Sequence, residues 1–212
     1  MITTNRRAFL VTIAAAAIAS TFNPTANAQG ASKGAVVIFP IVYSRNSGSS
    51  GSRETAVQSV GEVLQKAGYT LISNTVAENT WKRMRIVKPT TDRPSSMDEI
   101  VRFGKEMKAK YVVAPVFDFH SRSIWVDLGP KTISTATVDL MITSVRDRKV
   151  VYTRDGIQGR SDEKNSVLKD VGDVLLTPLV TIVSGGPKTP HEQRAVRIAV
   201  ARALNGWVRP TK

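Results

Sequence analysis

Residues 95–119 constrain the fold more than any other stretch of the chain, because they predict a capped helix followed by a buried strand. Ser96 and Glu99 have the spacing of a capping box, in which each side chain bonds a backbone N–H at the start of a helix. Apolar residues then recur at helical spacing, and Gly104 lies on this stripe, where a missing side chain would let the helix lie close to a sheet. Residues 111–119 are continuously apolar, which predicts a strand buried on both faces.

The elements before this stretch alternate between strands and helices. Residues 35–43 are apolar and rich in β-branched residues, so they predict a buried strand, with Pro40 marking its end or a bulge. A flexible Ser/Gly loop over 44–52 precedes a predicted helix at 54–67, and a short strand at 69–73 and a helix at 75–87 follow. This alternation predicts parallel neighbouring strands joined by helical crossovers.

The second half of the chain predicts a hairpin and a helical end. Residues 131–145 alternate between apolar and polar side chains, as a half-buried strand does, and 149–158 return as its partner. We expect 120–130 to connect 111–119 to this hairpin, and 162–187 to form a helical insertion. Thr189 as N-cap and Glu192 three residues later predict the start of the last helix. The predicted fold class is therefore α/β, a mixed parallel and antiparallel sheet flanked by helices, in a single domain over 29–212.

The first 28 residues have the pattern of a cleavable signal peptide. Arg6 and Arg7 precede an apolar run, and a small-x-small cleavage site ends at Ala28. The run is shorter than the roughly 20 residues of a spanning helix. The arginine pair resembles the twin-arginine export signal, but Asn5 and Val11 depart from it, so the general secretory route stays open. We expect a bacterial protein exported to the periplasm or the exterior, with no transmembrane span in its mature chain.

Composition narrows the chemistry of this mature chain. The 212 residues carry a formal charge of +13, and loss of the two arginines in 1–28 would leave +11. Such a charge favours anionic partners such as headgroups, cell-wall polymers or nucleic acid, although nothing here predicts specific nucleic-acid binding. The chain has no cysteine, which excludes disulfides, thiolate metal sites, a cysteine nucleophile and a lipidated cysteine.

Two segments resemble a recurring envelope domain. Residues 104–117 (GKEMKAKYVVAPVF) and 137–152 (TVDLMITSVRDRKVVY, with Asp147 in the turn) are similar to the curli-assembly lipoprotein (CsgG-like) domain and to the amino-terminal domain of the Tol-system propeller protein. The resemblance implies the same α/β fold and a protein partner in the cell envelope. It departs from those domains at Pro115, which interrupts the key strand, and in the missing lipidated cysteine.

Two surfaces are candidate binding sites. Apolar residues at a loop tip usually either extend a strand or form a surface that binds a partner. We expect a partner-binding surface that comprises Ile124, Trp125, Val126 and Leu128. Glycine N–H groups before a helix, together with nearby cations, favour an anion, although no nucleotide-binding fingerprint is present. The residues of this second hypothesis are Arg45, Gly48, Gly51, Arg53, Lys82, Arg83 and Arg85.

Catalytic signals are weak. Asp118 and His120 share one face of the predicted strand, so a carboxylate could orient an imidazole, but no nucleophile elbow accompanies them. The second histidine, His191, has no carboxylate cluster around it, so we expect no metal site and no cofactor. The sequence therefore predicts a non-enzymatic binding or assembly module that acts through an envelope protein. The alternatives are a basic protein that binds a polyanion or a membrane surface, and a metal-free hydrolase that uses His120 and Asp118.

Overall fold

The computed structural model describes residues 32–126, 129–163 and 189–208. Its described strands form one mixed six-stranded sheet, in the order β3-β1-β4-β5-β6, with β2 also paired to β4. The elements are β1 (Ala35–Ile38), β2 (Val42–Tyr43), α1 (Ser50–Lys66), β3 (Thr70–Leu71), α2 (Asn74–Arg83), α3 (Met97–Glu106), β4 (Tyr111–Val126), β5 (Gly129–Ser144), β6 (Lys149–Arg160) and α5 (Thr189–Val208).

Strand β4 is the centre of the sheet, as the sequence predicts. It pairs in parallel with β1 and β2 on one side and antiparallel with β5 on the other, and β6 continues from β5 in antiparallel register. Val112 and Val113 are fully buried. The predicted fold class and the hairpin formed by 131–145 and 149–158 are confirmed. None of the described helices is long and apolar enough to cross a membrane.

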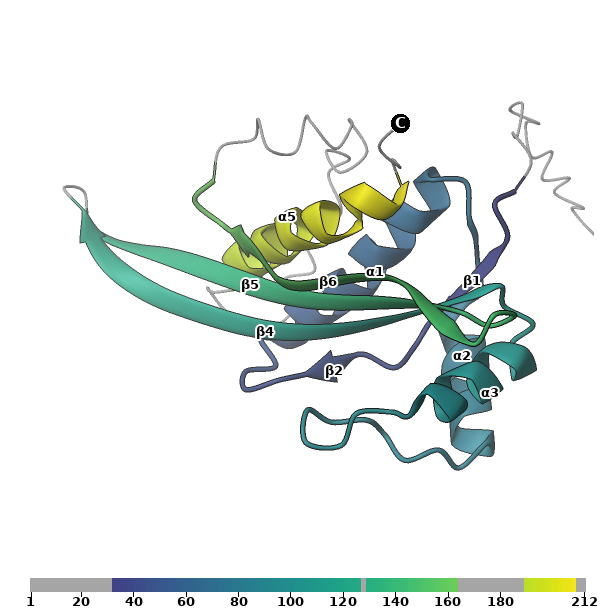
Figure 1. Cartoon of the computed structure of the whole chain (residues 1–212). Helices are drawn as coiled ribbons and strands as arrows, with labels where there is room; N and C mark the ends of the chain where they lie inside the picture. Colours follow the sequence, from purple (N-terminus) through teal and green to yellow (C-terminus); the bar gives the residue numbers. More distant parts are fainter. Residues whose placement is uncertain (1–31, 127–128, 164–188, 209–212) are drawn as a thin grey trace, which may run out of the picture.

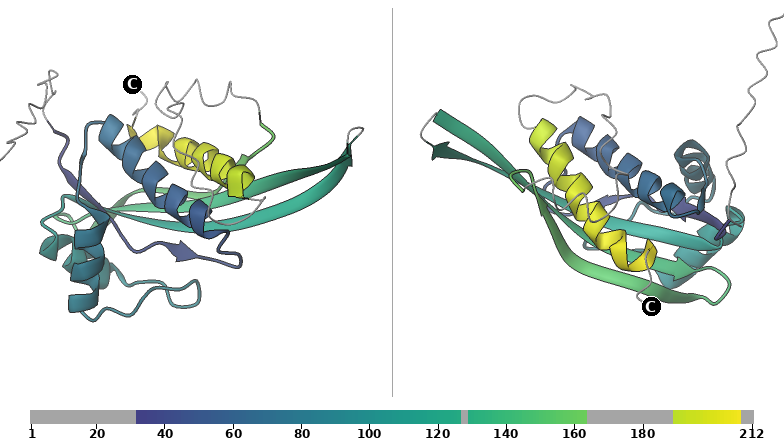
Figure 2. Two further views of the ribbon diagram at one scale, coloured as in Figure 1. Left: turned by 180° about the vertical axis from the view of Figure 1, so that it is seen from behind. Right: turned by 90° about the horizontal axis from the view of Figure 1, so that it is seen from above.

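Helices cover the two faces of the sheet unequally. Figure 1 shows α1 and α5 lying across one face, while α2 and α3 cover one end of the other face, and the view from above in Figure 2 shows α1 and α5 side by side. One apolar core joins α1, α5 and the inward residues of β4 and β5, including Phe117. A second core joins α2 and α3 to Phe39 and Val112. Trp81 of α2 is buried there.

Local signals around α3 are confirmed. Ser96 and Glu99 form the predicted capping box, with both reciprocal hydrogen bonds present. A Cβ on Gly104 would lie 2.4 Å from Cγ2 of Val145 and 2.7 Å from Cγ2 of Val112. The absence of a side chain at this position therefore lets α3 lie directly on the sheet.

Several predicted boundaries differ from the structure, and the helix predicted at 75–87 already ends at Arg83. Pro40 splits residues 35–43 into β1 and β2. Helix α1 begins at Ser50 rather than Glu54, because Ser49 is its N-cap and accepts the N–H of Ser52. Gly51 therefore lies in the first helical turn and not in a flexible loop, and Arg53 is also helical.

A further difference concerns residues 120–130. Strand β4 runs to Val126 and β5 begins at Gly129, so this segment is mostly strand and not a connection. Pro115 does not interrupt β4. The carbonyls of Val113 and Phe117 accept from Phe39 and Ser44, so odd-numbered residues direct their backbone groups toward β1 and β2. Pro115 thus faces the break between those two strands, where no N–H is needed.

Candidate partner-binding surface

Strands β4 and β5 continue as a two-stranded arm beyond the rest of the sheet. The pairing of β2 ends at Phe117, and the last pair between β5 and β6 is Thr135 with Arg160. Within the described part of the chain, the strand segments beyond these points pair with each other as far as Val126 and Gly129. We call residues 120–126 and 129–133 the arm. Both views in Figure 2 show it extending past the helices.

Apolar side chains gather near the end of the arm. Trp125 is 83% exposed and Val126 is 45% exposed, and both belong to a small set of exposed large apolar residues in the described chain. Trp125 lies opposite Pro130, and Ile124 lies opposite Lys131. Leu128, the fourth residue of the predicted partner surface, lies outside the described residues. Because side chains alternate along a strand, Trp125 lies on one face of the arm, and Ile124 and Val126 lie on the other.

The root of the arm is fixed to α1 and α5 by a buried carboxylate. Glu192 of α5 accepts hydrogen bonds from the N–H of Ser49 (2.9 Å), from Oγ of Ser52 (2.7 Å) and from Oγ of Ser121 in β4 (3.3 Å). Ser121 also bonds Ser134 of the neighbouring strand β5 (2.7 Å). Burial by itself raises the pKa of Glu192, but the hydrogen bonds from these serines outweigh it and hold the pKa below its ordinary value of 4.5.

Sequence reasoning assigned Glu192 to the wrong partners. It predicted a capping box within α5, whereas the carboxylate bonds the start of α1, more than 140 residues away. The N-terminus of a helix attracts a negative charge, so Glu192 takes the place that an external anion would take at Ser49 and Ser52.

We expect Glu192→Gln to reduce the free energy of unfolding at neutral pH by about 1–2 kcal/mol, because the amide keeps an acceptor but loses the charge that strengthens these bonds. Since the folded pKa lies below the ordinary value, the wild-type advantage is complete above about pH 4.5 and is lost as the pH falls through the folded pKa. Urea unfolding of both proteins from pH 7 down to the acid limit of folding measures it. An equal difference at every pH would contradict the assignment.

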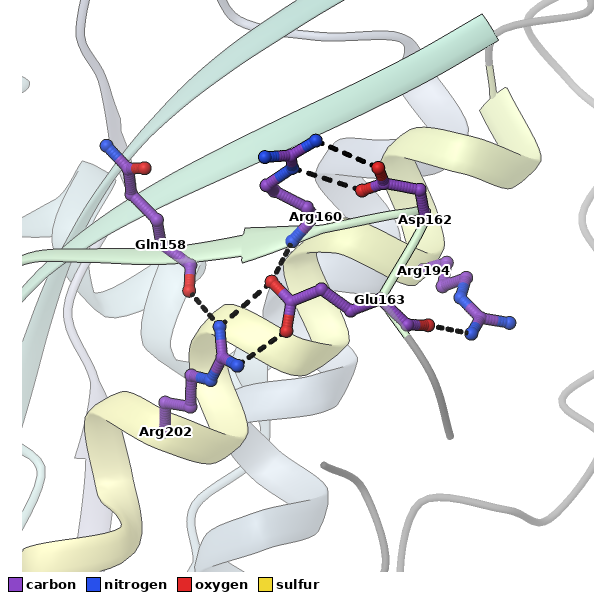
Figure 3. A network of polar contacts seen from close by, with 6 residues as sticks. All are labelled: Gln158, Arg160, Asp162, Glu163, Arg194 and Arg202. Atoms are coloured by element: carbon purple, nitrogen blue, oxygen red, sulfur yellow. Dashed lines mark hydrogen bonds and ion pairs between the residues drawn. The ribbon is translucent and has the colours of Figure 1, made fainter. Parts of the chain in front are cut away.

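A second polar network holds the end of β6 against α5 (Figure 3). Arg202 of α5 donates to both carboxylate oxygens of Glu163 and to the carbonyl oxygen of Gln158, at 2.7 Å from the latter. Arg194 donates to the carbonyl oxygen of Glu163, and Arg160 is paired with Asp162. Asp162 and Glu163 lie in a turn, and residues 164–187 of the predicted insertion lie outside the described residues. No local pattern signals the contacts of Glu163 with α5, because Arg194 and Arg202 follow it by 31 and 39 residues in the chain.

The residues of the anion hypothesis fall into two groups. Arg45 and Gly48 line a polar cavity of about 440 Å³ together with His120 and the Glu192 carboxylate. Gly51 and Arg53 lie just beyond it in α1, where Arg53 donates to Oγ of Ser47 (3.3 Å). Lys82 and Arg83 lie at the end of α2, against the opposite face of the sheet, with Arg85 just after it, and Arg83 is paired with Glu106.

Asp118 and His120 are not joined. Oδ1 of Asp118 accepts the N–H of Asn46 (2.9 Å), and His120 is exposed. Within residues 32–126, 129–163 and 189–208, no hydrogen bond links the two side chains. In the same ranges no three His, Cys, Asp or Glu side chains gather as metal ligands would.

No protein-family model matches this chain, and no curated protein matches it. Several solved structures are similar in fold. Lipoprotein GNA1162 from Neisseria meningitidis is 15% identical with a TM-score of 0.45, over 63% of this chain and 88% of that one. The LpoB C-terminal domain from Salmonella enterica is 12% identical with a TM-score of 0.41, over 61% and 82%.

The hypothetical protein CT253 from Chlamydia trachomatis is 18% identical with a TM-score of 0.44, over 85% of this chain and all (100%) of that chain. Such low scores and identities do not establish a shared activity or partner. The resemblance to the curli-assembly and Tol-system propeller domains is not confirmed by these structures.

Proposed function

We propose that this chain is an exported, non-enzymatic binding module of the bacterial cell envelope, and that the end of its arm docks on a protein partner. The observation that carries the proposal is Trp125, a large aromatic side chain that is 83% exposed on a two-stranded arm. The contact surface comprises Ile124, Trp125, Val126 and Leu128.

The physical chemistry of the arm supports a partner. A two-stranded ribbon alone is only marginally stable in water, so the end of the arm, beyond the buried Ile133, gains little from its own packing. Tryptophan buries roughly 150–250 Å² when covered, and it is enriched among residues that dominate binding energy at protein interfaces. An exposed tryptophan and an exposed valine at the end of one strand are therefore better explained by a partner surface than by the fold of this chain.

The second candidate is a polyanion or membrane surface held by the cations. The charge of +13 favours it, as do the exposed cations Lys82 and Arg85. The two functions respond differently to salt. Attraction between exposed charges is screened over roughly 10 Å at 0.1 M salt, whereas burial of an apolar side chain is nearly indifferent to it.

The test is capture of a cross-linked partner by the purified protein from an envelope extract, at low and at high salt. We expect capture to persist at high salt and to fall in Trp125→Ala by roughly 30-fold or more, as removal of a dominant interface residue does. Val150→Ala is the matched control, because Val150 is 40% exposed on β6, away from the arm. It should capture normally.

Both variants should keep the wild-type melting midpoint, since neither side chain is in a core. The opposite pattern would favour the second candidate over the first. In that pattern capture disappears at high salt, survives Trp125→Ala and is lost when Lys82 and Arg85 are replaced by glutamine.

A further inference from the structure

A groove lies on the face of the sheet opposite α1 and α5. It has a volume of about 270 Å³, between the sheet and the segment 84–96 that joins α2 to α3. Its apolar lining comes from the β1–β2 break and from β4 and β5 on one side and from two prolines of the segment on the other; the residues include Phe39, Pro40, Val116, Met141, Pro89 and Pro94. We call this the outer groove. It is smaller than the roughly 300–1,000 Å³ of cofactor pockets, so it suits one or two side chains.

Two carboxylates border the outer groove at the far strands. Asp139 of β5 and Asp155 of β6 both line it and are exposed. Oδ1 of Asp139 accepts the N–H of Gly156 (2.6 Å), which fixes the two aspartates next to each other on neighbouring strands. Neither forms an ion pair with a described residue, although the chain has 30 lysines and arginines against 17 acidic residues. The groove is thus a locally acidic site on a basic protein.

The roof of the groove contains an unsatisfied hydroxyl. Oγ of Ser95 is buried and has no hydrogen-bond partner among the described residues, and Ser95 lines the groove. A buried hydroxyl without a partner is energetically unfavourable, and a donor group entering from outside would remove that penalty. This observation is independent of the two carboxylates.

We propose that the outer groove binds a segment of a protein partner that presents an arginine or lysine side chain next to an apolar one. The aliphatic stem of a basic side chain can pack on an apolar surface while its charged head group remains in a polar environment. Here the stem lies along Val116 and Met141, and the head reaches Asp139 and Asp155. A guanidinium suits this site better than an ammonium, because its planar group can donate two hydrogen bonds to one carboxylate. The groove acts independently of the arm.

The test uses three blocked dipeptides: acetyl-leucyl-arginine amide, the same peptide with neutral citrulline in place of arginine, and the same peptide with glutamate. Backbone amide shifts of Val116 and Met141 in the purified protein report binding. We expect the arginine peptide to bind with a Kd on the order of 1 mM, as so small a ligand does. The citrulline peptide should bind at least about tenfold more weakly, and the glutamate peptide should not bind.

Asp139→Asn and Asp155→Asn each remove a charge while leaving an oxygen that can still accept, and together they should weaken arginine-peptide binding about tenfold. Asp98→Asn is the matched control, because Asp98 is an exposed carboxylate on α3, outside the groove. If the change at Asp139 disturbs the bulge around Gly156, the Asp155→Asn variant alone is used as the test. Trp125→Ala should leave peptide binding unchanged, which separates this proposal from that for the arm.

Three results would overturn the proposal. The first is an absence of shifts at peptide concentrations about tenfold above the expected Kd. The second is equal binding of the arginine and citrulline peptides, which would leave an apolar groove without charge selection. The third is movement of the same amides by calcium alone but not by the arginine peptide, which would make the aspartates an ion site.

Discussion

Gly159→Ala is expected to lower the free energy of unfolding by about 3 kcal/mol or more, at the upper end of what overpacking costs. Gly159 lies in β6 directly beneath α5. A Cβ there would lie 2.3 Å from the carbonyl oxygen of Ala195 and 2.4 Å from the backbone nitrogen of Ala199. Because both atoms belong to the helix backbone, no side chain can rotate away, and α5 as a whole would have to move. Urea unfolding of the purified protein measures the loss.

Gly61→Ala is the matched control for this prediction. Gly61 is also buried, in α1, but its Cβ would meet only flexible side-chain ends, the nearest being Cδ2 of Leu71 at 2.8 Å. Alanine is favoured over glycine inside a helix by about 1 kcal/mol, which offsets the adjustment of that leucine. We expect stability within about 1 kcal/mol of wild type. If Gly159→Ala behaved like Gly61→Ala, the direct contact of β6 with α5 would be wrong.

The parts of the fold that could be predicted are those whose signals are local. The capping box of Ser96 and Glu99, the glycine at 104 and the apolar run after 111 each involve residues that are neighbours in the chain. Their interactions are the same in most folds, so the sequence alone indicates them. The alternation of strand and helix then determines which neighbours are parallel.

The arm could not be predicted as an arm. The periodic signal of a strand arises because one face is buried and the other is exposed to solvent, and within the arm Arg122 and Ser123 are exposed while Ser121 is half-buried. Their polar sequence therefore resembles a connection. What the sequence did indicate was the unusual apolar group Ile124, Trp125 and Val126, since exposed apolar residues stand out against polar neighbours.

The polar contacts that fix the arm and β6 were missed for a different reason. Glu192 bonds Ser49 and Ser52 across 143 and 140 residues, and Glu163 bonds Arg202 across 39. A charged residue near a helix start satisfies the local capping pattern equally well, so the sequence favoured the local partner. Tertiary packing decides such cases, because a buried carboxylate bonds whichever donors enclose it.

Val113→Asp is expected to cost several kcal/mol, a large share of the roughly 5–15 kcal/mol that stabilises a typical domain. Val113 is fully buried in β4, with Ile38 of β1 on one side and Ile142 of β5 on the other. A carboxylate there would have no cation and no donor, so burial would raise its pKa in the folded state. The variant should therefore unfold at much lower urea, or fail to fold at neutral pH.

Val126→Asp makes the same change in the same strand and is the matched control, because Val126 is 45% exposed at the end of the arm. Its free energy of unfolding should stay within about 0.5 kcal/mol of wild type, the range of ordinary surface substitutions. The two variants should also differ in pH dependence. Because the folded pKa of an aspartate at 113 is raised, its penalty is complete above that pKa and decreases as falling pH neutralises the carboxylate. Equal midpoints for the two variants would show that residues 111–117 are not the centre of the sheet.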